Sequence, residues 1–145
     1  MSEGVVDAFD GLWEFSPEAS RLASPSPHEW TQHITIAGDD VRVIEDIVFA
    51  DGKHATVTVK ARLDGSDYPV DGSPVADAIA YTRINARCVT AAAKLRGRPT
   101  FEETAVVSDD GQTLTVTLSF VTQTGERTSS VAVFRRSLTG PRRDE

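Results

Sequence analysis

Apolar and polar residues alternate along much of this chain, and short turn sequences separate the alternating segments. From Val41 to Phe49 every second residue belongs to one face, which is apolar except at Glu45, and the hairpin dipeptide Asp51-Gly52 follows. In the next segment, Lys53 to Leu63, polar and apolar residues alternate from His54 onward. This period of two predicts β-strands with one buried face and one face in water.

The same pattern occurs at both ends of the chain. Near the C-terminus, Asp110-Gly111 and Thr124-Gly125 bracket an alternating segment and lead into another, which predicts an antiparallel meander. Near the N-terminus two further strands are expected on either side of a loop that carries three prolines. The segments are Thr113 to Gln123, Arg127 to Arg136, Leu12 to Ser16 and His28 to Ile36, with the loop at Pro17 to Pro27.

Two middle segments are less regular. Asp64 to Asp77 contains Gly-Ser and Asp-Gly turns and two prolines, so we expect an irregular connection with one short strand at Tyr68 to Val70. In Val75 to Arg96, the alanines at 91–93 favour a helix, whereas the β-branched residues on either side of Asn85-Ala86 favour a hairpin. We take the hairpin, because every neighbouring segment is a strand.

These segments add up to about eight to ten short antiparallel strands, which predicts an all-β domain. A closed barrel is favoured over a sandwich because closure removes the exposed edges of the sheet. We expect a lead-in at residues 1–10, a single barrel domain at 11–137 and a polar, flexible tail at 138–145.

Charge and composition narrow the range of partners. The 145 residues include 22 acidic and 15 basic side chains, a formal charge of -7, which disfavours binding to nucleic acid or to an anionic membrane. The single Cys88 excludes an internal disulfide, and the N-terminus lacks a secretory pattern, so a cytoplasmic protein is expected. The three histidines lie on separate segments. No metal and no cofactor is predicted, because no motif for either is present.

Three stretches also carry a family resemblance: Phe9-Asp10-Gly11-Leu12-Trp13, the Asp64 to Asp77 segment with its glycines and prolines, and Val106 to Val116. Together they resemble small bacterial lipocalin-like (calycin-like) β-barrels of largely unassigned function. The resemblance implies an up-and-down barrel with a cup for a small apolar molecule. It also implies that a basic residue at the end of the last strand, Arg135 or Arg136, stacks on Trp13.

A few polar residues fall on otherwise apolar faces. Gln32 and Glu45 are expected to point into the barrel, and Arg83, which shares a face with Tyr81, is the natural partner for Glu45. Three interpretations remain open for Glu45: an internal ion pair, a ligand-orienting or acid–base group, or an outward position if the register is shifted by one residue.

Further residues complete the candidate site. Glu103 falls on the same alternating face as Phe101 and is the inward candidate of the pair Glu102-Glu103. Thr104 and Val106 also allow the opposite choice, and a solvated edge is the other alternative. Aromatic residues that can line a pocket are Trp30, Phe49, Tyr68, Phe101 and Phe120.

The leading functional prediction is an intracellular barrel that binds a small apolar or amphipathic molecule. One alternative is a cofactor-independent cyclase, isomerase or dehydratase that acts inside the same barrel, with Glu45 and Tyr81 as its catalytic residues. The second alternative is an interaction module whose barrel is filled by its own side chains. A homo-oligomer is compatible with each of them.

Overall fold

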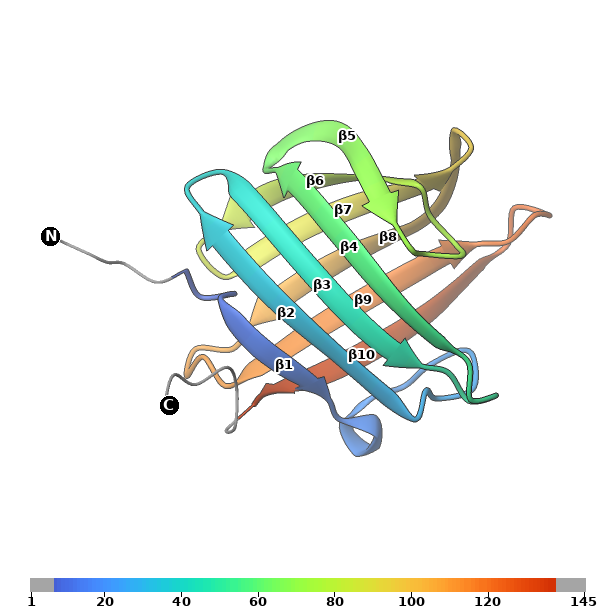
Figure 1. The fold of residues 1–145 in the computed structure, drawn as a ribbon, viewed down its shortest axis with the longest axis horizontal. Coiled ribbons are helices and arrows are strands. Elements are labelled where there is room, and N and C mark those ends of the chain that lie inside the picture. Colours follow the sequence, from blue (N-terminus) through green and yellow to red (C-terminus); the bar gives the residue numbers. More distant parts are fainter. Residues whose placement is uncertain (1–6, 138–145) are drawn as a thin grey trace, which may run out of the picture.

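The strands close into one barrel. The computed structural model describes residues 7–137, and its ten strands form a ring in which β1 pairs with both β2 and β10 (Figure 1). Every neighbouring pair is antiparallel. The elements are β1 (Gly11–Phe15), the short 3₁₀ helix η1 (Pro17–Ala19), β2 (Glu29–Ala37), β3 (Asp40–Val48), β4 (His54–Arg62), β5 (Asp64–Asp71), β6 (Ala78–Asn85), β7 (Cys88–Leu95), β8 (Arg98–Val107), β9 (Thr113–Val121) and β10 (Arg127–Arg136).

The alternation in the sequence sets which side chains face inward. Val43 and Val59 pair across β3 and β4 and are both buried. Their neighbours Arg42 and Lys60 pair on the outer face and are exposed. The barrel is thus mainly apolar inside and mainly polar outside, as the period of two predicts.

The all-β prediction of a single barrel is confirmed, with ten strands. The hairpin in Val75 to Arg96 is also confirmed, although its turn lies at Ala86-Arg87, one residue later than expected. The alanines fit a strand because Ala91 and Ala93 are buried inside the barrel while Ala92 is exposed. In residues 7–137 no helix has the length and apolarity that crossing a membrane requires.

The prediction for Asp64 to Asp77 is wrong in extent. The strand β5 runs through Asp64–Asp71 and pairs with β6, and the register shifts between Asp64 and Asp67. The turn-forming residues therefore lie in a β-bulge, where Gly65 takes a φ of 78°. A bulge uses the same residue types as a turn, so the pattern suggested a break where the strand continues.

One end of the barrel is closed by the segment before β1. Phe9 is buried against the core, and its carbonyl accepts a 2.9 Å hydrogen bond from Nε1 of Trp13. Asp10 Oδ1 accepts a 2.7 Å bond from the backbone N–H of Ile36 on β2. Residues 7–10 are thus attached to the barrel. Residues 1–6 of the predicted lead-in and the whole predicted tail lie outside the described residues.

Arg136 is the basic residue that stacks on Trp13. Its guanidinium carbon lies 4.3 Å from the centre of the indole ring. The same group donates hydrogen bonds to the carbonyls of Asp10, Ala8 and Gly111. A glycine is needed at position 11, where φ is 132° and a Cβ would lie 2.5 Å from Nη1 of Arg136.

Candidate functional site

The barrel encloses a cavity that its own side chains do not fill. The cavity has a volume of about 550 Å³, within the range of about 300–1,000 Å³ that is typical of small-molecule sites. Most of its lining is aliphatic or aromatic. The alternative of a barrel packed solid by its own side chains is therefore wrong.

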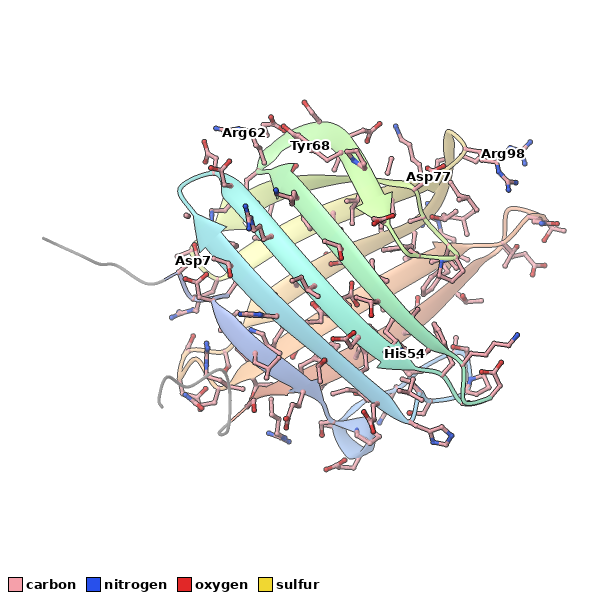
Figure 2. All side chains as sticks on the ribbon, viewed as in Figure 1. Asp7, His54, Arg62, Tyr68, Asp77 and Arg98 are labelled. Carbon is pink, nitrogen blue, oxygen red and sulfur yellow. The ribbon has the colours of Figure 1, made fainter. Side chains whose placement is uncertain are left out.

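The cavity reaches from the closed end to the loops at the opposite end. Phe9 lines it at the closed end, and Pro25, Pro27 and the Ser73–Ala76 loop line it at the other. Asp7 and His54, labelled in Figure 2, mark these two ends of the barrel. We call the loops around Pro25 and Ser73–Ala76 the mouth of the cavity, because they line its end opposite Phe9.

Four of the five aromatic residues predicted for a pocket line the cavity: Trp30, Phe49, Phe101 and Phe120. The rings of Phe101 and Phe120 are 5.3 Å apart, and the ring of Trp30 lies 4.9 Å from that of Phe134. Tyr68 does not belong to this group. It does not line the cavity but is partly buried against the edge of the core, and its hydroxyl donates a 2.7 Å hydrogen bond to Asp64.

Glu45 and Gln32 both line the cavity, where they pair side by side on β3 and β2. Glu45 Oε1 accepts a 2.8 Å hydrogen bond from Nε1 of Trp30. Burial raises the pKa of Glu45 above its ordinary value, and the hydrogen bond from Trp30 opposes this shift. Glu45 is thus a carboxyl group with one fixed donor inside an apolar cavity.

Glu103 on β8 and Tyr81 on β6 come from the wall opposite Gln32 and Glu45, and they lie on either side of Ala91 on β7. The register pairs Tyr81 with Ala91 and Ala91 with Glu103, so the small alanine separates the two polar side chains. Burial, and then repulsion from Glu45, raises the pKa of Glu103 to about 8. Burial also raises the pKa of Tyr81 well above its usual value, with repulsion from Glu103 and Glu45 adding to the shift. The cavity therefore holds one carboxyl that favours the protonated form at neutral pH.

Comparisons with known proteins bear on the fold. No protein-family model and no curated protein sequence matches the chain. Among solved structures, the chain is similar to the zebrafish ileal bile acid-binding protein complexed with cholic acid, with a TM-score of 0.56 and 13% sequence identity. The match covers 90% of this chain and 99% of the other. The protein has the calycin-like fold. At this identity, the likeness is one of fold alone.

Arg83 is not the partner of Glu45 in this calycin-like barrel. Its guanidinium donates hydrogen bonds to Asp7 and to the carbonyls of Asn85 and Ala86. Arg83 has the inward parity that the sequence predicts, but it lies near the closed end of β6, where Asp7 provides the nearer carboxylate. It is not among the described residues that line the cavity, so the predicted Glu45–Arg83 ion pair is wrong.

Several lining residues were not predicted. They belong to the loops Leu22 to Pro27 and Ser73 to Ala76, and to Thr128 and Ser130 on β10. Ser130 Oγ accepts a 2.8 Å hydrogen bond from the backbone of Ala23, which attaches the first loop to the barrel. Pro25 and Pro27 in that loop were the available signal, because a proline-rich segment is restricted enough to hold a fixed path.

The calycin-like barrel offers little that could hold a metal. Among residues 7–137, no three histidine, cysteine, aspartate or glutamate side chains gather in one place. His33 and His54 are exposed on the outer face of the barrel. Cys88 is partly buried and does not contribute to the described lining of the cavity.

Proposed function

We propose that this protein binds one small, mostly apolar molecule in the cavity of its barrel. The observation that carries the proposal is the cavity of about 550 Å³ inside the barrel, lined mainly by valine, isoleucine, leucine and phenylalanine. Water in such a space makes few hydrogen bonds, so its replacement by an apolar molecule is favourable. The fold adds support by analogy, since the zebrafish bile acid-binding protein was solved in complex with cholic acid.

A neutral apolar fluorophore, N-phenyl-1-naphthylamine, tests this proposal. Its emission is expected to rise on binding and to saturate at one molecule per chain. Ala105 lines the cavity on β8, so Ala105→Phe fills part of the space. Thr104→Phe is the matched control, because Thr104 is the adjacent residue and points outward.

The proposal predicts that Thr104→Phe binds the fluorophore as the wild type does, whereas Ala105→Phe binds it at least about tenfold more weakly. Circular dichroism and thermal unfolding show whether both variants fold. Equal binding by two folded variants contradicts binding in the cavity, and so does an absence of saturable binding by the wild type.

A second candidate function is an acid–base isomerisation in the same cavity. It is favoured by the presence of Glu45, Glu103 and Tyr81 in one cavity. Burial raises the pKa of both carboxyl groups, to about 8 for Glu103, and the hydrogen bond from Trp30 opposes the shift at Glu45. In this proposal Glu45 removes a proton from the carbon next to a ketone, and Tyr81 donates a hydrogen bond to the ketone oxygen. Glu45 then returns the proton two carbons further along, which moves the double bond.

The conversion of an apolar β,γ-unsaturated ketone into its conjugated isomer, followed by ultraviolet absorbance, tests this second function. Glu45→Gln is expected to bind the ketone normally and to convert it at no more than about one hundredth of the wild-type rate. No conversion by the wild type, or equal conversion by Glu45→Gln, excludes the role given to Glu45. Cyclisation and dehydration would rely on the same residues.

Two further inferences concern the setting of the protein. We infer that the chain belongs among small bacterial lipocalin-like proteins, on the support of its Gly11-Leu12-Trp13 element and the stacking of Arg136 on Trp13. We also infer that it acts in the cytoplasm, where a single cysteine is kept reduced. Fractionation of host cells tests the compartment, and light scattering on the purified protein tests whether it forms a homo-oligomer.

A further inference from the structure

The cavity contains acidic side chains and no cationic one. Glu45 and Glu103 line it, and among the described residues no lysine, arginine or histidine does. The two carboxyl groups come from β3 and β8, which are five strands apart in either direction around the ring. They therefore project from opposite walls into the same space.

Several polar atoms in this space have no hydrogen-bond partner. Trp30 donates to one oxygen of Glu45. Within residues 7–137, nothing donates to its second oxygen or to the carboxyl of Glu103, and the hydroxyl of Tyr81 is unpaired as well. Tyr81 is only 8% exposed, so this hydroxyl belongs to the interior of the barrel. These residues line the open space of the cavity, so a ligand that fills this space can bring donors to their oxygens.

We propose that the ligand is an amphipathic amine, whose apolar body fills the cavity and whose protonated amino group lies between Glu45 and Glu103. This inference rests on the binding function proposed above. An ammonium group carries three donors and no acceptor, and its charge compensates a buried carboxylate. A carboxylate ligand would instead add a third acidic group to the cavity and meet no cation there.

The protonation of the empty cavity supports this assignment. The pKa of Glu103 is raised to about 8 by burial and by Glu45, so at pH 7 Glu103 holds a proton. The titratable groups that face it are Glu45 from β3 and Tyr81 from β6, while the adjacent strands place Ala91 and Leu118 beside it. An ammonium group favours the ionised form of both carboxyls. Binding of an amine should therefore release a proton to the solvent, whereas binding of an alcohol should not.

Three probes with the same ten-carbon chain test the inference: decylamine, decan-1-ol and decanoate. Each is used at pH 7, below its micelle concentration, to displace N-phenyl-1-naphthylamine. Decylamine is expected to displace the fluorophore at a concentration at least about tenfold lower than decan-1-ol, and decanoate is expected to be the weakest. Titration calorimetry in two buffers of different ionisation enthalpy measures the proton that decylamine releases.

Two double variants of equal charge show where the preference arises. Glu45→Gln/Glu103→Gln removes both cavity carboxyls, and Glu18→Gln/Glu102→Gln removes two exposed ones. The cavity variant is expected to bind decylamine no more tightly than decan-1-ol, and the surface variant is expected to keep the wild-type preference.

The outcomes separate the two proposals. If decanoate binds as tightly as decylamine, or if the cavity variant keeps the preference for the amine, the amine assignment is wrong while the binding function stands. If neither the fluorophore nor any of the three probes binds, the binding function fails and the amine assignment fails with it.

Discussion

Trp30 lies diagonally across from Glu45 on the β2–β3 pair, and its indole N–H donates a 2.8 Å hydrogen bond to the Glu45 carboxylate. Both side chains line the cavity. The chain has only one other tryptophan, Trp13, which is fully buried and does not contribute to the described lining. Trp30 is therefore a natural reporter of what occupies the barrel.

We expect decan-1-ol to shift the tryptophan emission of the wild type to shorter wavelength, because it replaces water next to Trp30. In Trp30→Phe the shift should vanish, while decan-1-ol still displaces N-phenyl-1-naphthylamine. A shift of equal size in Trp30→Phe would mean that the alcohol acts near Trp13, outside the cavity.

The closed end makes a prediction about stability. Arg136 stacks on Trp13 and donates to three carbonyls, so Arg136→Ala is expected to lower the free energy of unfolding by about 3 kcal/mol. Arg135 is adjacent and exposed. Arg135→Ala should therefore change the free energy of unfolding by less than about 0.5 kcal/mol. Urea denaturation measures both values. Similar values for the two variants would contradict the structural role of Arg136.

Glu103 should make stability depend on pH. Its pKa is raised from 4.5 to about 8 in the folded protein, so between these values the folded state binds more protons than the unfolded state. The contribution of Glu103 to the free energy of unfolding is therefore fully present below pH 4.5. It is lost as the pH rises toward 8, with a slope of up to about 1.4 kcal/mol per pH unit.

Denaturation at pH 5, 6.5 and 8 checks this dependence. Glu103→Gln should lose less stability than the wild type as the pH rises. Glu102→Gln, which alters the exposed neighbour, should follow the wild type. The same slope in all three proteins would show that Glu103 ionises freely in the folded state.

Alternation along the sequence favoured inward positions for Glu45 and Glu103, because each falls on the same face of its strand as apolar neighbours. It left open an outward Glu45 and a solvated edge at Glu103, and the pairing of the strands brings both side chains to the cavity. Parity does not say how far along the barrel axis a side chain lies. For this reason Arg83 was expected at the cavity and instead pairs with Asp7 at the closed end.

The remaining differences come from segments without periodicity. The bulge in β5 uses the residues of a turn, so its pairing with β6 could be recognised only once both strands were in place. The loops at the mouth have no repeating pattern that would direct them toward the cavity. Their position depends on contacts distant in sequence, such as the bond between Ala23 and Ser130.

The central claim is that a small apolar molecule binds inside the barrel, and nuclear Overhauser contacts from bound N-phenyl-1-naphthylamine to the protein test it most directly. We predict contacts to the interior residues Val43, Val116 and Phe120. The outer face also carries exposed apolar side chains, at Ile44, Ile84 and Val106. Contacts to those three residues, without contacts to the interior, would contradict the claim.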